Sequence, residues 1–218
     1  MLSVPNKKSI NEPALERFLY HCHKRKYPKN HDILVPGDRA DCLYYIVDGS
    51  ISIILKDQED REIILAYLNK NDFIGEIGVF HGPNTLQVTI KTRSECVLAE
   101  IPLNRFHTII RGELAEDATD LLFAIGRQLS NRLLQTSRKV GHLTFLDVTD
   151  RIAKALIDLC KEPDAMTHPD GMQIRITRQE IGRIVGCSRE MAGRVLKNLE
   201  REGFVSARGK TIVVYGTR

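Results

Sequence analysis

A pair of short helical segments joined by a glycine, near the C-terminus, constrains the fold of this chain more than any other feature. The run Thr-Arg-Gln-Glu is a capping box, in which Thr177 caps a helix and Glu180 reaches back to its first turn. Gly186 tolerates the left-handed backbone that ends a helix, and Ser188 caps the helix that follows. The spacing predicts a helix-turn-helix over residues 178–197.

The second helix of this pair begins with side chains that suit the base edges of the DNA major groove. Arg189 and Arg194 can each donate two hydrogen bonds to guanine, and Glu190 can accept one from cytosine. A hairpin predicted over residues 205–215 would form a wing beside this helix. The side chains expected to contact DNA are Arg178, Gln179, Ser188, Arg189, Glu190, Arg194 and Lys197. A plain helical hairpin with solvated charges is the competing interpretation.

Positive charge is concentrated in the C-terminal third of the chain. Residues 138–218 contain 15 Lys and Arg against 10 Asp and Glu, whereas the rest of the chain contains 17 against 18. This modest excess favours a polyanionic partner. The 218 residues, 42% of them hydrophobic, suit one large domain or two small ones that bury a core.

The sequence indicates neither export, nor a metal site, nor an enzyme. No apolar run approaches the roughly 18 residues of a membrane span, and no apolar secretion signal is visible, so a cytoplasmic location is expected. The five cysteines are an odd number without a Cys-x-x-Cys pair, which argues against disulfides, an iron–sulfur cluster and zinc. No nucleophile elbow, Walker loop or His-Glu-x-x-His motif is present, so no catalytic residue is expected.

The region between residues 31 and 101 has the pattern of short strands. Apolar residues alternate in five runs, which Gly, Asn, Asp and Pro turn signals separate: residues 42–47, 51–55, 63–67, 88–90 and 96–101. This pattern predicts an all-β sandwich or barrel.

A long helix is predicted next, over residues 117–140, with Gly141 ending it. Four residues recur in it at a spacing near 3.5, which is typical of a coiled-coil seam: Leu122, Ile125, Leu129 and Thr136. The spacing favours a dimer seam slightly over an amphipathic helix packed on its own sheet. Helical pattern resumes over residues 147–160, and a loop with Pro and Gly is predicted over 161–171.

Several stretches carry a family resemblance. The stretch at 178–194 resembles the recognition region of the cyclic AMP receptor protein subfamily of the CRP/FNR superfamily, reading Arg-Gln-Glu-Ile-Gly-Arg-Ile-Val-Gly-Cys-Ser-Arg-Glu-Met-Ala-Gly-Arg. Further similar stretches lie at residues 72–80, 145–149, 163–173 and 209–218, so the similarity covers nearly the whole chain. The runs Asp-Val-Thr-Asp at 147–150 and Met-Ala-Gly at 191–193 are similar to the Clp branch of xanthomonads.

The resemblance implies an α+β chain in three parts. These are a cyclic-nucleotide-binding β jelly roll over residues 1–116, a dimerisation helix over 117–140, and a winged helix-turn-helix over 141–218. The chain would be a dimeric, sequence-specific transcription regulator and activator of a palindromic operator, with a hinge near residues 145–149. Two patches would contact RNA polymerase: Thr167, His168, Asp170 and Gly171 in one, and His23, Arg25 and Arg105 in the other.

The resemblance also implies a nucleotide pocket, with one departure from the family pattern. Glu76 would accept a hydrogen bond from the ribose 2′-hydroxyl, and Thr136 and Ser137 would contact adenine. The expected ligand-binding residues are Gly75, Glu76, Ile77, Gly78, Leu86, Gln87, Thr136 and Ser137. The family's phosphate-binding Arg-Ser pair falls on Leu86 and Gln87, and a leucine cannot pair with a phosphate.

This departure leaves the effector open. Losing a charge-assisted contact costs about 1.5–3 kcal/mol, and the neighbouring Lys91 and Arg93 are expected to point elsewhere. His81 and Thr85 are weaker substitutes. Cyclic AMP and cyclic di-GMP are both candidates. The alternatives are a regulator that binds DNA constitutively with a degenerate pocket, or a nucleotide-sensing module that acts on a protein partner.

Overall fold

The computed structural model describes residues 12–217 and divides the chain into two compact units. The first unit contains the described residues up to Leu55 together with 66–135, and the second contains 56–65 together with the residues from Thr136 onward. The N-terminal residues 1–11, where no secretion signal is expected, and Arg218 lie outside the described residues. Within residues 12–217, no helix has the length and apolar character needed to cross a membrane.

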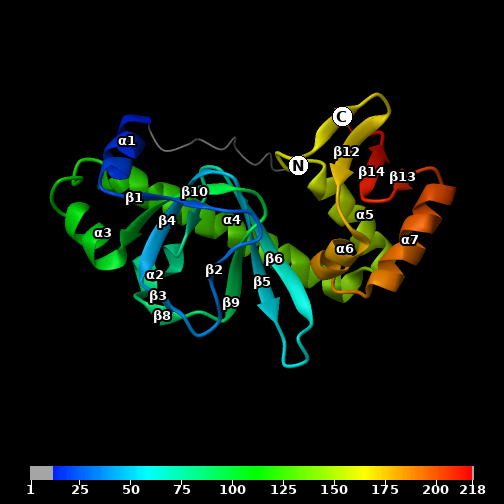
Figure 1. Cartoon of the computed structure of the whole chain (residues 1–218), viewed down its shortest axis with the longest axis horizontal. Helices are drawn as coiled ribbons and strands as arrows, with labels where there is room; N and C mark the ends of the chain where they lie inside the picture. Colours follow the sequence, from blue (N-terminus) through cyan, green and yellow to red (C-terminus); the bar gives the residue numbers. More distant parts are fainter. Residues whose placement is uncertain (1–11, 218) are drawn as a thin grey trace. The chain divides into compact units, whose positions relative to one another are not determined.

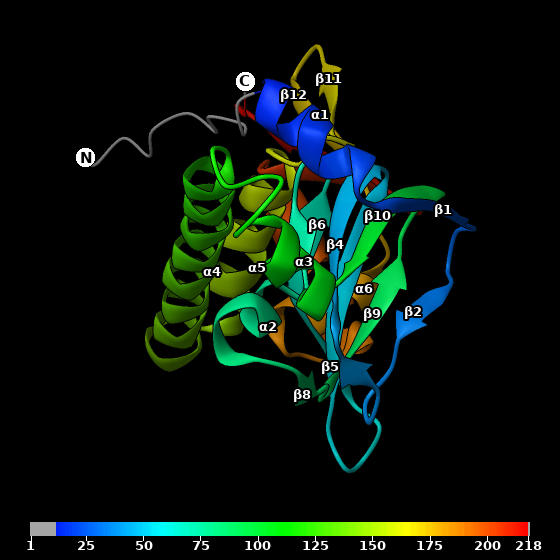
Figure 2. The ribbon, with the colours of Figure 1, turned by 90° about the vertical axis from the view of Figure 1, so that its left-hand side faces the viewer.

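Two four-stranded antiparallel sheets are formed by the N-terminal half of the chain (Figure 2). One has the order β1 (His23–Tyr27), β10 (Cys96–Pro102), β4 (Cys42–Asp48) and β7 (Phe73–Ile74). The other has the order β2 (Asp32–Leu34), β9 (Val88–Thr92), β5 (Ser50–Lys56) and β6 (Glu62–Asn69). A third, two-stranded sheet pairs β3 (Arg39–Ala40) with β8 (Asn84–Thr85). All five predicted strands are confirmed.

The strands that the sequence did not predict are short or polar. Strand β1 reads His-Lys-Arg-Lys-Tyr, and only Tyr27 is buried, so it has no apolar alternation. Its position comes from pairing along β10, with His23 opposite Glu100 and Tyr27 opposite Cys96. Backbone pairing, rather than side-chain pattern, therefore specifies this edge strand.

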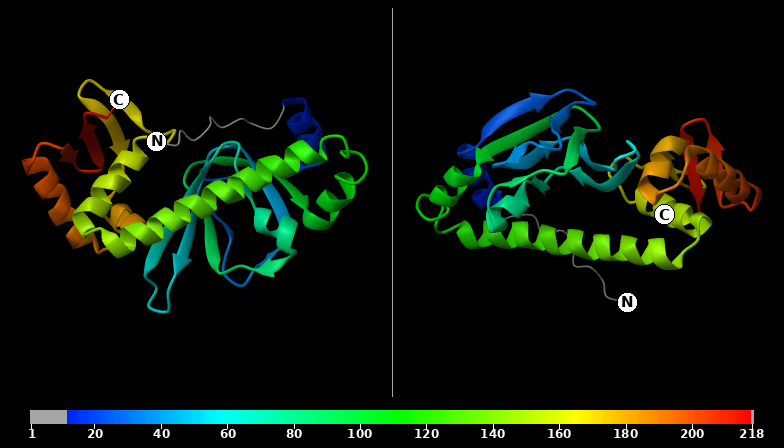
Figure 3. Two further views of the ribbon diagram at one scale, coloured as in Figure 1. Left: turned by 180° about the vertical axis from the view of Figure 1, so that it is seen from behind. Right: turned by 90° about the horizontal axis from the view of Figure 1, so that it is seen from below.

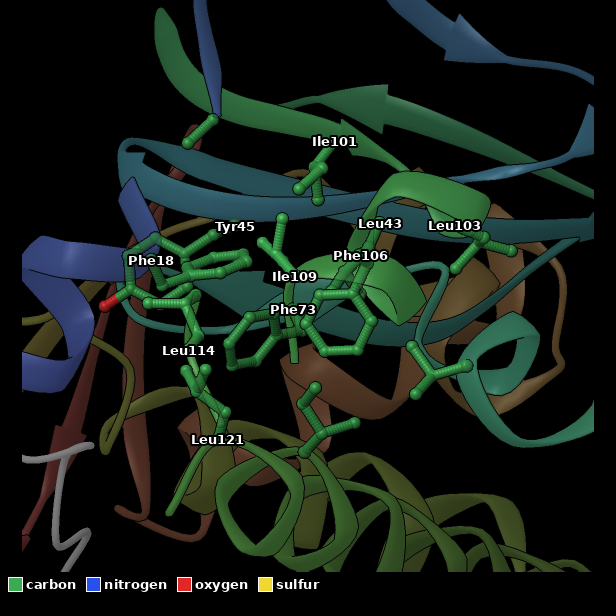
Figure 4. Close-up of a cluster of buried hydrophobic side chains, with 13 residues drawn as sticks. Phe18, Leu43, Tyr45, Phe73, Ile101, Leu103, Phe106, Ile109, Leu114 and Leu121 are labelled. Atoms are coloured by element: carbon green, nitrogen blue, oxygen red, sulfur yellow. The ribbon is translucent and has the colours of Figure 1, made fainter. Parts of the chain in front are cut away.

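Aromatic side chains occupy the centre of the first unit (Figure 4). Phe18 of α1 (Glu12–Tyr20) lies with its ring centroid 6.0 Å from that of Phe106 in α3 (Leu103–Ile109) and 6.1 Å from that of Phe73. Leu121 and Ile125 of the following long helix are fully buried in the same cluster. The hydrophobic core thus fixes the first half of that helix on its own sheet.

The long helix α4 (Ala118–Phe145) is one uninterrupted element (Figure 3). The prediction that Gly141 ends it is wrong, because the backbone of Gly141 is not left-handed and the helix continues to Phe145. A glycine inside a helix costs only about 1 kcal/mol, which neighbouring turns can offset. The proposed seam is also wrong in part, since Ile125 is buried in the chain's own core.

The second unit contains three short helices and a four-stranded sheet (Figure 1). The helices are α5 (Val148–Leu159), α6 (Arg178–Val185) and α7 (Arg189–Arg201). The sheet has the order β11 (Met166–His168), β12 (Gly171–Arg175), β14 (Thr211–Tyr215) and β13 (Val205–Arg208). The hairpin predicted over residues 205–215 is confirmed. The predicted loop at 161–171 is wrong in part, because β11 forms there by pairing with β12.

Candidate functional site

Helices α6 and α7 both begin where the sequence predicts and α6 ends where predicted, whereas α7 continues to Arg201, four residues beyond the predicted range. Thr177 Oγ1 accepts a hydrogen bond from the backbone N–H of Glu180 at 3.1 Å, and Ser188 Oγ accepts one from Met191 at 3.2 Å. Gly186 ends α6 in the left-handed conformation, with φ of 72°. A Cβ atom on Gly182 would lie 2.5 Å from the carbonyl oxygen of Cys187. The turn between the helices is therefore too close to α6 for a larger residue.

The charged side chains of α7 lie on its outward face. Arg189, Glu190, Arg194 and Lys197 are exposed, whereas the opposite face buries Ala192, Val195, Leu196 and Leu199. The pKa of Glu190 is lowered by hydrogen bonding from its own backbone N–H and from Ser188, so its carboxylate is charged at neutral pH. Two cations and one acceptor are thus presented on the first two turns of a capped helix, the geometry of a recognition helix.

Arg178 connects α6 to the wing turn. Its guanidinium donates to the carbonyl oxygen of Gly209 at 3.0 Å, and its stem passes Gly193, where a Cβ atom would lie 3.6 Å from it. Gln179 is exposed beside it at the start of α6. Of the seven predicted DNA-contacting side chains, Arg178 is thus the one held by the wing.

The predicted ligand-binding residues at 75–78 form the start of α2 (Glu76–His81). Gly75 has a φ of 82°, and a Cβ atom there would lie 2.2 Å from the carbonyl oxygen of Cys42. The close approach of strand β4 therefore requires a glycine at position 75, independently of any ligand. Glu76 is buried, Gly78 packs against Leu103, and Ile77 is exposed.

Arg132 of α4 supplies a cation beside Glu76. Its guanidinium forms an ion pair with the Glu76 carboxylate and donates to the carbonyl oxygen of Phe73 at 2.7 Å. Within the described chain, its Nε is a buried donor with no hydrogen-bond partner. Gln128, one turn earlier, pairs with both backbone groups of Phe73, at 2.7 and 2.8 Å. Two polar side chains of α4 therefore dock on strand β7.

Sequence reasoning missed Arg132, although a signal was available. It precedes Thr136 by four residues on the same helix, so the two share a helix face. Thr136 and Ser137 themselves are exposed on α4. The available indication was an arginine one helical turn from Thr136, the predicted base contact.

Leu86 and Gln87 supply no charge to this region. Leu86 packs against a hydrophobic cluster, and Gln87 is exposed. Lys91 pairs with Asp32 at 2.9 Å, and the guanidinium of Arg93 lies 3.8 Å from the ring centroid of Tyr67. The prediction that these two cations point elsewhere is confirmed.

The residues expected to contact RNA polymerase lie in two places, one in each unit. Thr167 and His168 lie on β11, Asp170 lies in the turn that follows, and Gly171 is the first residue of β12. His23 and Arg25 are exposed on β1, and Arg105 is exposed on α3. Burial raises the pKa of Cys22, beside β1, to about 12, while the charges of Arg105 and Lys24 oppose this shift.

Comparison with known families covers both units. The cyclic nucleotide-binding domain family matches residues 24–113, and the Crp-like helix-turn-helix domain family matches residues 150–215. Among residues 12–217, no group of three or more His, Cys, Asp or Glu side chains is arranged to hold a metal ion.

Individual relatives extend this similarity over nearly the whole chain. The CRP-like protein Clp of Xanthomonas campestris pv. campestris (strain B100) is 52% identical over 210 residues, covering 96% of this chain and 91% of that protein. The solved structure of the c-di-GMP responsive global regulator CLP from Xanthomonas campestris is also 52% identical, with a TM-score of 0.89, covering 95% of this chain and all of that chain.

A more distant structure shares the fold. A CRP-family transcriptional regulator from Thermus thermophilus is 20% identical, with a TM-score of 0.72, and the match covers 88% of this chain and 91% of that one. The capped helix pair, the domain matches and the full-length similarity agree with one another. The chain belongs to the CRP/FNR family, as a CRP-like transcription regulator with a cyclic nucleotide-binding domain and a DNA-binding helix-turn-helix.

Proposed function

We propose that this regulator works as a cytoplasmic homodimer that reads a palindromic operator with α7, responds to a cyclic nucleotide and contacts RNA polymerase. The observation that carries the proposal is the outward face of α7, where Arg189, Glu190 and Arg194 are exposed behind the Ser188 cap. These three side chains read base edges, and Arg178, Gln179, Ser188 and Lys197 position the helix on phosphates. We propose the three functional parts predicted from the sequence, residues 1–116, 117–140 and 141–218, with the dimerisation helix continuing to Phe145.

A row of exposed and partly exposed residues along α4 supports the dimer. Apolar and small side chains recur there with alternating spacings of three and four residues: Phe123, Gly126, Ser130, Leu133, Ser137 and Val140. Phe123, Leu133 and Val140 are each at least 60% exposed, an unusual state for large apolar side chains on one helix face. This row is shifted by one residue from the seam that the sequence predicted, because Ile125 points into the core.

The dimer has a direct test. Leu133→Glu places a charge in the seam, so we expect a monomer by analytical ultracentrifugation at concentrations where the wild type is a dimer. Gln135→Glu is the matched control, because Gln135 is exposed on another face of α4. A Leu133→Glu protein that still sediments as a dimer would refute this seam.

We propose cyclic di-GMP as the effector. A regulator that is 52% identical over nearly the whole chain is described as c-di-GMP responsive. The cradle at 75–78 lacks an arginine at Leu86, and its nearest cation, Arg132, already pairs with Glu76. A phosphate group of cyclic di-GMP would compete with the Glu76 carboxylate for the guanidinium of Arg132. The Nε of Arg132, which has no hydrogen-bond partner among the described residues, is a further donor for that phosphate.

Fluorescence anisotropy with a palindromic duplex, with and without each nucleotide, tests this proposal. We expect cyclic di-GMP to change the duplex Kd of the wild type at least fivefold, and cyclic AMP to change it little. Arg132→Gln should remove the response to cyclic di-GMP. A response to cyclic AMP alone would reassign the effector, and no response to either would favour constitutive DNA binding with a degenerate pocket.

Exposed side chains in both candidate patches support the proposed contact with RNA polymerase. Thr167 and Asp170 are exposed, as are His23, Arg25 and Arg105. Substituting alanine at Thr167 and Asp170 together should lower transcription in a purified system while leaving the duplex Kd unchanged. A loss of both activities would show that this turn serves DNA binding instead.

A further inference from the structure

The tip of the β5–β6 hairpin carries an ion-pair cluster that the DNA-binding assignment does not explain. Glu62, the first residue of β6, accepts from Arg183 of α6 at 2.8 Å with one carboxylate oxygen, and its other oxygen lies 3.1 Å from Nζ of Lys56. The Glu62 side chain is 19% exposed, so water competes only in part for these contacts. One carboxylate therefore joins the hairpin to the first helix of the helix-turn-helix.

A second contact fastens the same hairpin. Nζ of Lys139 on α4 donates to the carbonyl oxygens of Ile64 and Leu65, at 3.2 and 2.6 Å. Desolvation by burial lowers the pKa of Lys139, and the charge of Asp158 opposes this shift. Residues 56–65 accordingly belong to the same compact unit as the helix-turn-helix.

Arg183 lies on a face of α6 distinct from the one that meets α7. Ile181, Gly182 and Val185 are buried, and Arg178 passes Gly193 of α7, whereas Arg183 reaches Glu62. Arg183 is therefore not placed to read bases. Its role is to fix the helix that supports the recognition helix.

We propose that Glu62 is a positioning residue for DNA binding: its bond to Arg183 holds α6, and with it α7, in the orientation that reads DNA. This rests on the sequence-specific DNA binding assigned to α7. Without the Glu62–Arg183 bond, the orientation of α7 is less restricted before DNA binds. More conformational entropy is then lost on binding, so the complex is weaker. One partly exposed ion pair contributes little to the free energy of DNA binding. A dimer contains two such pairs, and losing both should raise the Kd for DNA about fivefold.

The test uses the full chain and a palindromic duplex in fluorescence anisotropy. We expect Glu62→Gln and Arg183→Gln each to weaken binding about fivefold, and the double variant to be no weaker than either single variant. Glu59→Gln is the matched control, because Glu59 is on the same hairpin and pairs with Arg61 only within it. Unchanged or tighter binding by Glu62→Gln, or additive effects in the double variant, would overturn the proposal.

A second measurement does not depend on DNA. Arg183→Gln should release the hairpin, so trypsin should cleave after Arg61 several-fold faster than in the wild type. Arg201→Gln, which also removes an exposed arginine of the same unit, should leave that rate unchanged. Equal cleavage rates in wild type and Arg183→Gln would show that the Glu62–Arg183 ion pair does not hold the hairpin, whatever the result of the DNA-binding test.

Discussion

The recognition helix and the ligand cradle place their polar side chains in opposite ways. On α7, Arg189, Glu190 and Arg194 face outward, and the helix caps and core residues support them from behind. In the cradle, Glu76 is 3% exposed and already paired with Arg132. A DNA-reading surface can stay open because water solvates its charges, whereas a buried carboxylate needs a partner before any ligand arrives.

The largest expected effect on stability comes from a substitution in the ligand cradle, at Glu76. Glu76→Ala leaves the Arg132 guanidinium beside strand β7 without its counter-charge. We expect the free energy of unfolding to fall by about 3 kcal/mol, as when one partner of a buried pair is removed. Urea denaturation measures this. Glu59→Ala, which breaks an exposed pair with Arg61, should change it by about 0.5 kcal/mol or less. Equal effects at the two sites would show that the cradle pair is solvated.

A glycine substitution tests how tightly the reading helices are joined. Gly182→Ala puts a Cβ atom 2.5 Å from the Cys187 carbonyl oxygen, so the turn must shift. We expect a loss of about 2 kcal/mol in urea denaturation. Gly141→Ala is the matched helical control, because nothing lies within 4 Å of a Cβ there. It should stabilise the protein by about 0.5–1 kcal/mol, and a stabilising Gly182→Ala would disprove the close packing.

The smallest of the three effects concerns a helix cap. Thr177→Ala removes the acceptor for the Glu180 N–H at the start of α6. We expect a loss of about 1 kcal/mol, measured as a lower midpoint of thermal unfolding. Thr119→Ala, at an exposed position of α4, should change stability by about 0.5 kcal/mol or less. If both variants unfolded at the wild-type temperature, the capping box would contribute nothing to stability.

Sequence patterns predicted the elements whose signal is local. The capping residues, the turn glycine and the alternating strands each depend on neighbours within a few positions, and all were found where predicted. Strands β1 and β11 escaped prediction because their partners, β10 and β12, specify them through the backbone. Gly141 misled in the other direction, since a glycine with a right-handed backbone can continue a helix at a cost of about 1 kcal/mol.

The cradle was predictable only in part, for a different reason. The family resemblance identified Gly75 and Glu76, but Arg132 is 56 residues away from Glu76 and enters the site only because α4 packs on β7. Ile125 shows the same limit, because heptad spacing cannot tell a core-facing residue from a partner-facing one. Contacts between distant segments decide both cases.

Sequence discrimination by α7 is the central claim, and one ratio tests it most directly: the Kd for a scrambled duplex divided by the Kd for the operator. For the wild type we expect a ratio of about 10³ or more. Arg194→Ala should lower this ratio roughly 100-fold, since each of two half-sites loses a bidentate contact. Arg201→Ala, at the far end of α7, should leave it unchanged. An Arg194→Ala protein with the wild-type ratio would contradict the assignment of α7 as the base-reading helix.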